Sequence, residues 1–252
     1  MGAIVAVVHA RGGSVRVPLK NIRPLAGTPL VVWTIEAALA SRCDRVIVST
    51  DHDDIAQIAR SVGADVPFRR PVDISEDVAS ELVTQHAIAF HERETGKRVD
   101  LALTIQPTTP FLKGTDIDAC IEMLQRNPDL KSVFTAGPIH ERPEWMFLRD
   151  DRGRATKFLD GVLHGDAGIS QTLPPLWIPN GGAYATRREV LFDEGIIIAD
   201  PCGIHPMSEW ASVDIDTEAD FVYAEMIAQK FGWVKTRHPS LSTKSDSQRN
   251  VE

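Results

Sequence analysis

Runs of apolar residues alternate along the chain with segments in which apolar positions recur every three or four residues. Residues 3–10 (AIVAVVHA) form a continuous apolar run, which is typical of a strand buried on both faces of a parallel sheet. Residues 29–41 follow with helical spacing, and the alternation continues to about residue 137. Repeated strand–helix units predict an α/β fold with a mostly parallel, doubly wound sheet. Further strands are predicted at 44–51, 100–108 and 131–137, and further helices at 53–63, 80–96 and 116–127.

The alternation breaks between about residues 138 and 178. Within this insertion, residues 141–161 are interpreted as two strands joined by the turn residues of DDRG. Its aromatic side chains are Trp145, Phe147 and Phe158. A hairpin that carries large apolar groups outside the main sheet is expected to cover something, either an active site or a second subunit.

The strand–helix pattern returns after the insertion. Residues 181–192 predict a strand followed by a helix, and residues 213–231 (VDIDTEADFVYAEMIAQKF) predict a strand that ends in a long helix. Residues 236–252 offer almost nothing to bury and are expected to be disordered. We therefore predict one domain over residues 1–235, with the insertion inside it, and a disordered tail.

Composition narrows the choice of partners. The 252 residues are 43% hydrophobic and 25% charged, as in an average globular protein. No apolar run approaches the roughly 18 residues of a membrane span, so no membrane partner is predicted. The net charge of −8 argues against general nucleic-acid binding, so any positive site must be local. The three cysteines are widely separated and form no CxxC pair, which favours a cytoplasmic location.

Residues 10–21 (ARGGSVRVPLKN) combine glycine and positive charge directly after the first strand, at the sheet edge where open α/β folds bind ligands. Gly12 and Gly13 let the backbone approach a phosphate group, and Arg11 and Lys20 add charge-assisted contacts. The motif matches neither GxxxxGK[ST] nor GxGxxG, so neither a Walker loop nor a dinucleotide fingerprint is indicated. A solvated turn is the alternative, but the position favours phosphate binding.

Residues 212–220 (SVDIDTEAD) contain a second candidate site. On a strand, Asp214 and Asp216 would face the same side about 7 Å apart. Two carboxylates suit Mg²⁺, which keeps several waters and takes its other ligands from substrate phosphates. The alternative is that Asp216 or Thr217 caps the helix that begins near Glu218. Capping leaves Asp214 without a role, and we therefore favour the metal interpretation.

Shorter signals mark the ends of other predicted strands. The STDHDD motif at 49–54 is interpreted as a helix start, and QPTTP is a stiff segment suited to holding Gln106 at a pocket. PNGGAY places Asn180 in a tight turn or in a wall against which a ligand packs. His9 ends the first strand and is interpreted as structural rather than catalytic. No H-x-x-x-H motif or Ser/His/Asp order indicates hydrolysis.

The motifs ARGGSVRVPLKN, VIVSTD, FRRP, SEDVAS, QPTTP, PNGGAY and SVDIDTEADF together resemble those of the acylneuraminate cytidylyltransferase family in order and separation. The resemblance extends from about residue 3 to residue 231. It implies a Rossmann-like nucleotidyltransferase domain, CTP as substrate, Mg²⁺, and a homodimer. It also implies a protruding dimerisation hairpin, which suits residues 140–160. The implied reaction is attack of an acceptor oxygen on the α-phosphorus of CTP, which yields a CMP-activated acid and pyrophosphate.

The same resemblance implies roles for individual residues. Arg11, Lys20 and Asp216 would be catalytic, and Asp214 and Asp216 would ligate Mg²⁺. Carried over motif by motif, the residues implied to bind CTP are Arg11, Ser14, Lys20, Asn21, Arg70 and Ser80. The loop chemistry adds Gly12 and Gly13 to this set, and Arg16 is added as the cation that would reach the phosphates in place of the lysine lost at Val15.

Base and acceptor recognition are implied by three other motifs. Arg70 and Ser80 match positions that recognise cytosine, and Arg70 is the reason to expect CTP rather than UTP or ATP. Gln106 and Asn180 would line the acceptor pocket. The acceptor is predicted to be a nonulosonic, sialic acid-like sugar acid.

The chain departs from the family pattern at several cations. Val15 occupies the usual lysine position of the loop, with Arg16 one residue later. Ser170 and Ile178 occupy positions where the sialate enzymes carry arginines, and the "PLR" after the glutamine motif has become Phe-Leu with Lys113 displaced. Two alternatives therefore stay open: a phosphonate cytidylyltransferase, and a CTP-binding homologue that has lost turnover.

Overall fold

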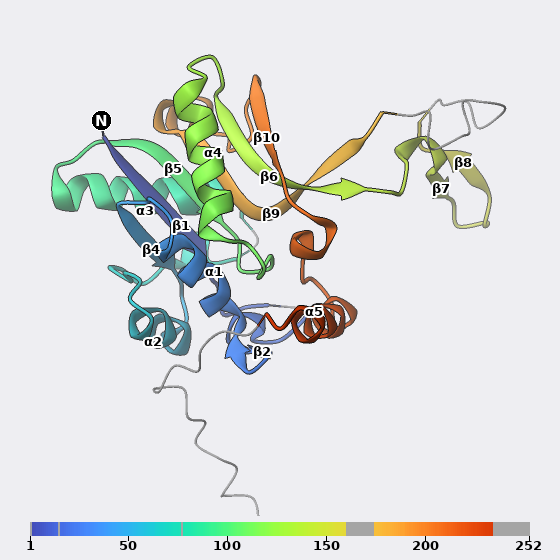
Figure 1. The fold of residues 1–252 in the computed structure, drawn as a ribbon, viewed down its shortest axis with the longest axis horizontal. Helices are drawn as coiled ribbons and strands as arrows, with labels where there is room; N and C mark the ends of the chain where they lie inside the picture. Colours follow the sequence, from blue (N-terminus) through green and yellow to red (C-terminus); the bar gives the residue numbers. More distant parts are fainter. Residues whose placement is uncertain (1, 15, 77, 160–173, 234–252) are drawn as a thin grey trace, which may run out of the picture.

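The computed structural model describes residues 2–14, 16–76, 78–159 and 174–233. A six-stranded sheet in the order β10-β6-β9-β5-β1-β4 forms its centre (Figure 1). β1 is parallel to β4 and β5, and β6 is parallel to β10, whereas β9 is antiparallel to both neighbours. The predicted α/β fold with a mostly parallel sheet is confirmed. The strands of this sheet are β1 Ala3–His9, β4 Arg45–Ser49, β5 Val99–Ile105, β6 Ser132–Ile139, β9 Leu176–Arg187 and β10 Cys202–Pro206.

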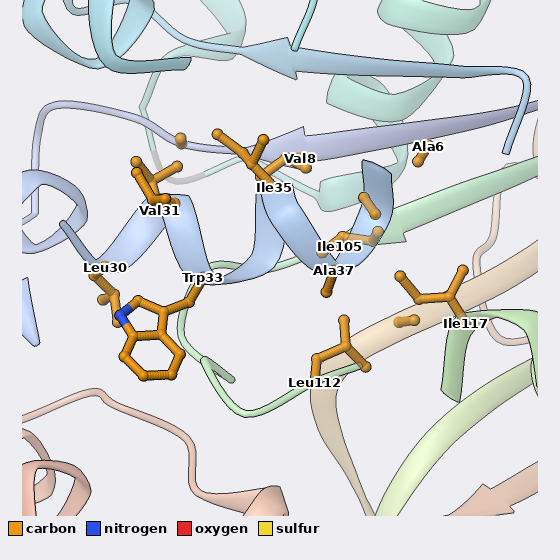
Figure 2. Packing of buried hydrophobic residues seen from close by; sticks show 14 of the residues in the cluster. Ala6, Val8, Leu30, Val31, Trp33, Ile35, Ala37, Ile105, Leu112 and Ile117 are labelled. Carbon is orange, nitrogen blue, oxygen red and sulfur yellow. The ribbon is translucent and has the colours of Figure 1, made fainter. Parts of the chain in front are cut away.

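Helices cover both faces of the sheet because alternate side chains of β1 enter two hydrophobic clusters. Ala6 and Val8 belong to the cluster that contains α1 (Leu30–Leu39). Figure 2 shows α1 against this face of the sheet, with Ile35 beside Val8. Val5 and Val7 belong to the second cluster, with Ala87 and Ile88 of α3 (Ser80–Thr95). This arrangement confirms the doubly wound prediction.

The helix that follows STDHDD begins at a side-chain cap. His52 Nδ1 accepts a hydrogen bond from the Asp54 N–H at 3.3 Å, so STDHDD is a helix start as predicted. The other α-helices are α2 Asp53–Ser61, α4 Gly114–Arg126 and α5 Glu218–Phe231. Short helices are η1 Lys20–Ile22, η2 Val72–Ile74, η3 Pro143–Trp145, η6 Val190–Glu194 and η7 Glu209–Ser212, and a small ribbon joins β2 Pro24–Leu25 to β3 Thr28–Pro29.

The sequence-based prediction of a strand at the start of 213–231 is wrong. Residues 213–216 are extended but belong to no strand. The Ile215 N–H donates to the Thr108 carbonyl at 2.8 Å, so this segment crosses the ends of the strands instead of joining them edge to edge. The edge position of the sheet belongs to β10, which the hydrophobic pattern did not predict.

The insertion forms an antiparallel hairpin that projects away from the sheet, at the end of extensions of β6 and β9 (Figure 1). Its strands are β7 Phe147–Arg149 and β8 Ala155–Lys157. Gly153 in the DDRG turn has a φ of 80°, which favours glycine. Residues 160–173, including Ser170, and the predicted tail at 236–252 lie outside the described residues.

Candidate active site

A cleft of about 340 Å³ opens at the carboxyl ends of β1 and β5, where the position of the glycine motif after the first strand predicted ligand binding. The predicted site residues that line it are Arg11, Ser14, Arg16, Lys20, Asn21, Arg70, Ser80, Gln106 and Asp216. The structure therefore brings together residues from both ends of the chain. Gly12, Gly13, Asp214 and Asn180 are not among the lining residues.

Two side chains from other parts of the chain hold the glycine loop in place. The Asn21 side chain donates to the Arg11 carbonyl at 2.8 Å, and the Gly12 N–H donates to the Asp51 carboxylate at 2.8 Å. A Cβ at Gly12 would lie 2.7 Å from a His52 ring carbon, so only glycine fits this close approach. The Gly12 N–H is therefore already bonded in this structure, and the CTP-binding role of Gly12 stays a prediction. Sequence reasoning gave Asp51 no such role.

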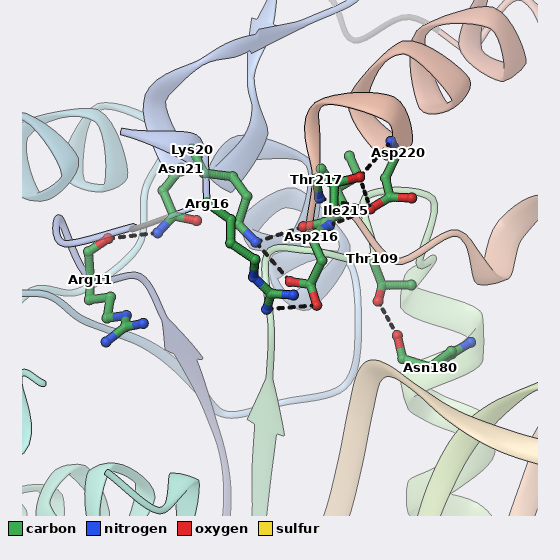
Figure 3. Close-up of polar contacts among 10 residues, drawn as sticks. All are labelled: Arg11, Arg16, Lys20, Asn21, Thr109, Asn180, Ile215, Asp216, Thr217 and Asp220. Carbon is green, nitrogen blue, oxygen red and sulfur yellow. Dashed lines mark hydrogen bonds and ion pairs between the residues drawn. The ribbon is translucent and has the colours of Figure 1, made fainter. Parts of the chain in front are cut away.

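Two cations of the loop converge on Asp216 (Figure 3). Lys20 Nζ donates to Asp216 Oδ1 at 3.2 Å and to the Ile215 carbonyl at 2.6 Å, and Arg16 Nη2 pairs with Asp216 Oδ2 at 3.0 Å. The Arg16 side chain is 67% exposed and the Lys20 side chain only 12%. The Lys20 contact is therefore the better shielded, whereas solvent and salt weaken the Arg16 pair.

The cap of α5 does not use the two site carboxylates. Thr217 Oγ1 accepts from the Asp220 N–H at 3.3 Å, and Asp220 Oδ2 accepts from the Thr217 N–H at 2.7 Å. These contacts form a reciprocal capping box. The capping alternative is thus satisfied by Thr217 and Asp220, and the carboxylates of Asp214 and Asp216 remain for another purpose.

Asp214 lies close to Asp216, but its carboxylate is in a less favourable environment. Desolvation raises the pKa of Asp214 although its side chain is exposed, and repulsion from Asp216 raises it further, while Thr108 and Lys20 oppose the rise. Thr108 Oγ1 is buried and has no well-formed hydrogen bond within the described residues. The Asp214 carboxylate, the Asp216 carboxylate and the Thr108 hydroxyl therefore form a set of oxygen atoms that fits a hard cation.

No group of three or more histidine, cysteine or acidic side chains in the described part of the chain is arranged to hold a metal ion. Two carboxylates alone do not form a complete cage. The set nevertheless agrees with Mg²⁺, which binds through one or two carboxylates and completes its shell with water and phosphate.

Arg70 and Ser80 define the other end of the cleft. Arg70 is 5% exposed, and its Nε and Nη2 donate to the Ser49 hydroxyl at 3.0 Å and the Ser49 carbonyl at 2.5 Å. Burial lowers the pKa of Arg70 to about 10, so the guanidinium stays charged at neutral pH. Ser80 begins α3 at the same end. Both residues are therefore fixed where a ligand can contact them.

Gln106 and Asn180 lie in different places despite their shared predicted role. Gln106 lines the cleft. Asn180 is 3% exposed, its Oδ1 accepts from Thr135 Oγ1 at 2.7 Å, and its Nδ2 donates to Ser212 Oγ at 3.1 Å. The Thr109 hydroxyl also donates to the Asn180 carbonyl (Figure 3). These contacts assign Asn180 to joining β6, β9 and η7. Its acceptor-binding role stays a prediction.

The structure also places the residues at which the chain departs from the family pattern. Phe111 and Leu112 are buried in the core, and Lys113 precedes α4 with its Nζ 5.9 Å from the Trp233 ring centroid. Ile178 is exposed on β9. Val15 and Ser170 lie outside the described residues.

His9 was interpreted as structural, yet it also lines the cleft. Its Nε2 lies 2.9 Å from Thr84 Oγ1 on α3. Burial and the charge of Arg70 lower the pKa of His9 to about 3, so its imidazole is neutral at physiological pH. The only sequence signal for this placement was its position at the carboxyl end of the first strand.

Comparison with known proteins agrees with this geometry. The family described as Cytidylyltransferase matches residues 5–150. The chain is 34% identical to CMP-N,N'-diacetyllegionaminic acid synthase of Legionella pneumophila, over 90% of this chain and 96% of the relative. It is 32% identical to N-acylneuraminate cytidylyltransferase A of Danio rerio, over 94% of this chain but only 54% of that longer relative.

A solved structure of a CMP:2-keto-3-deoxy-manno-octonic acid synthetase complexed with CTP superposes with a TM-score of 0.66, covering 90% of this chain and 99% of that one. At 17% identity this likeness concerns the fold alone. The match to the family and the sequence identity that extends over most of the chain agree with the motifs of the cleft. The chain belongs to the cytidylyltransferase family.

Proposed function

We propose that this protein transfers CMP from CTP to an acidic sugar and releases pyrophosphate. The observation that carries this proposal is the meeting of the loop cations with Asp216 in the cleft that Arg70 and Ser80 also line. A triphosphate bound in this cleft would lie beside the loop cations and the Asp216 carboxylate, with Asp214 close to Asp216. The relatives named as CMP-legionaminic acid and N-acylneuraminate enzymes support a sugar acid as the acceptor.

The residues of the chain supply binding and charge stabilisation. Arg11, Ser14 and Asn21 bind the nucleotide, and Lys20 holds positive charge at the cleft wall where the phosphoryl oxygens gain negative charge. The acceptor hydroxyl attacks the α-phosphorus, the bond to pyrophosphate breaks, and the hydroxyl proton passes to a carboxylate such as Asp216 or to water. Electrostatic preorganisation of this kind is usually the largest contribution to catalysis.

Asp214 and Asp216 are proposed to hold Mg²⁺. When bound, the ion neutralises phosphate charge and orients the triphosphate. The raised pKa of Asp214 supports this proposal, because a cation would favour its ionised form. Arg16 and Lys20 form ion pairs with Asp216 in this structure. With Mg²⁺ bound to Asp216, both cations would be released to contact phosphate oxygens.

The identity of the acceptor is tested by measuring pyrophosphate release. We expect release from CTP and Mg²⁺ with nonulosonic acids such as legionaminic, neuraminic or pseudaminic acid. A panel of phosphonates is the comparison, because Ile178 is an exposed apolar residue where the sialate enzymes carry an arginine. Turnover with phosphonates alone would replace the sugar-acid proposal, and no turnover with either panel would contradict the proposed reaction.

We also propose that the hairpin forms a homodimer interface. Phe147 is 52% exposed and Leu148 is 56% exposed, and Met146, Phe158 and Trp177 are exposed nearby in the insertion and its β9 extension. Apolar groups that cluster on a projection are costly in water and are typical of protein interfaces.

Replacing both Phe147 and Leu148 with aspartate is expected to turn a dimer into a monomer in sedimentation velocity. Two charges in an apolar contact remain desolvated and unpaired, which costs several kcal/mol. Arg152→Asp in the hairpin turn is the charge-matched control and is expected to remain dimeric. A wild-type protein that is monomeric at micromolar concentration would contradict the proposal.

A cytoplasmic location is proposed as well. Cys43, Cys120 and Cys202 are free thiols, and burial raises the pKa of Cys120 to about 12, which makes it unreactive. Free thiols agree with a reducing compartment. Within the described residues, no helix has the length and hydropathy needed to cross a bilayer.

A further inference from the structure

His9 is the first member of a hydrogen-bonded row that runs from the cleft into the core. Its Nε2 lies 2.9 Å from Thr84 Oγ1, which in turn lies 2.7 Å from Thr104 Oγ1. Thr84 lies on α3 and Thr104 on β5, and both are almost completely buried. Because water does not reach these hydroxyls, the donors and acceptors of the row must satisfy one another.

Only one assignment of donors and acceptors gives both threonine hydroxyl hydrogens an acceptor. If Thr104 donates to Thr84 and Thr84 donates to His9 Nε2, both hydroxyl hydrogens have an acceptor. In the opposite direction the Thr104 hydrogen has no acceptor within the described residues and would be left buried and unpaired. The favoured direction makes Nε2 the acceptor, so the single proton of the neutral imidazole is on Nδ1.

The Nδ1–H of His9 is therefore a donor without a partner in the described part of the chain. Arg70 lines the same cleft, and its charge acts on His9. Ser49 accepts from Arg70 Nε and Nη2, which leaves Nη1 without a hydrogen bond to the described residues. His9 Nδ1 and Arg70 Nη1 are thus two donors in one cleft, and the other nitrogen atoms of both side chains are held by buried hydrogen-bond partners.

We propose that His9 determines base specificity, by donating from Nδ1 together with Arg70 to the adjacent N3 and O2 acceptors of a cytosine base. Uracil carries a hydrogen on N3, so two donors would meet there and one would be left unpaired. Sites that hydrogen-bond a substrate group reject an analogue that cannot match it. The inference rests on the proposed use of CTP and adds His9 to the residues that contact the base.

Two substitutions separate this role from a structural one. His9→Asn keeps an N–H donor near the position of Nδ1 but loses the contact with Thr84, whereas His9→Gln keeps the contact near Nε2 and loses the donor toward the cleft. We expect His9→Gln to lower the preference for CTP over UTP by about 10-fold, and His9→Asn to retain most of it. A purely structural role predicts the opposite order.

The preference is measured as the ratio of dissociation constants for CTP and UTP by calorimetry, which needs no acceptor, and as the ratio of kcat/KM where turnover is seen. His91→Gln, a buried histidine on α3 that contacts Arg45 away from the cleft, is the matched control and should leave both ratios unchanged. Thermal melting checks the folding of each variant.

The outcomes distinguish the two proposals. If wild type binds CTP in preference to UTP but no acceptor reacts, the proposed reaction fails while the His9 comparison still decides the base proposal. Retained preference in His9→Gln, or equal binding of CTP and UTP by wild type, overturns the role of His9. A protein that binds neither nucleotide overturns both.

Discussion

Replacing Asp214 with asparagine is expected to lower kcat by at least about 10²-fold while leaving the fold intact. The amide keeps the size of the side chain but removes the negative charge with which Asp214 would hold Mg²⁺ next to Asp216. Pyrophosphate release at saturating CTP and acceptor measures the loss. A Mg²⁺-dependent rise in melting temperature with CTP, present in wild type and reduced in the variant, gives a readout that does not depend on turnover.

The same substitution is expected to leave thermal stability unchanged or slightly higher. Desolvation and Asp216 raise the pKa of Asp214 on folding, so its ionised form costs stability once the pH exceeds the pKa of the unfolded state. Removing the charge at pH 7 removes that cost, which is small because the side chain is exposed and screened. Asp129→Asn, on the surface between α4 and β6, is the control and should change neither kcat nor the melting temperature. Wild-type turnover in Asp214→Asn would contradict the metal proposal.

The sequence predicted most of the fold because burial on both faces leaves a strong signal. Residues 3–10 are apolar without interruption, and the structure shows their side chains alternating between two clusters. Capping chemistry likewise identified the start of α2 from STDHDD. The segment 213–216 resembles a strand in sequence because Val213 and Ile215 are buried and alternate with aspartates. Alternation reports burial on one side, and it cannot report whether the backbone has a neighbouring strand with which to pair.

The residues of the candidate site could be predicted where their motif directly follows a strand. A residue at that point of the chain must lie at the carboxyl edge of the sheet, where the cleft is. This holds for Arg11, Lys20 and Gln106, which all line the cleft. Asn180 is harder to interpret from sequence, since a buried amide on a strand can bind a ligand or join neighbouring elements, and its contacts with Thr135 and Ser212 show only the second. The place of His9 in the cleft could not be predicted in this way, because the buried hydroxyls of Thr84 and Thr104 that orient its ring are distant in sequence.

Lys20→Met is expected to lower kcat/KM for CTP by about 10² to 10³-fold. The ammonium group is shielded, and it reaches both the Ile215 carbonyl and Asp216. Its replacement removes a fixed positive charge from the place where the phosphates are expected to bind, and methionine preserves the length of the stem. Steady-state kinetics with varied CTP, together with calorimetric binding of CTP, would separate lost binding from lost turnover.

Arg16→Gln provides the informative comparison, because the same carboxylate is contacted by a cation that is far more exposed. We expect a smaller loss, about 10-fold or less, that fades as salt is added, since screening already weakens exposed charges. Lys97→Met, on the surface before β5, controls for removing a lysine and should have no effect. If Arg16→Gln proves as damaging as Lys20→Met, then Arg16 must contact bound CTP, in the role of the lysine that Val15 replaces. If Lys20→Met binds and turns over CTP normally, the loop does not hold the triphosphate, because no shielded cation of the loop would then contribute to binding.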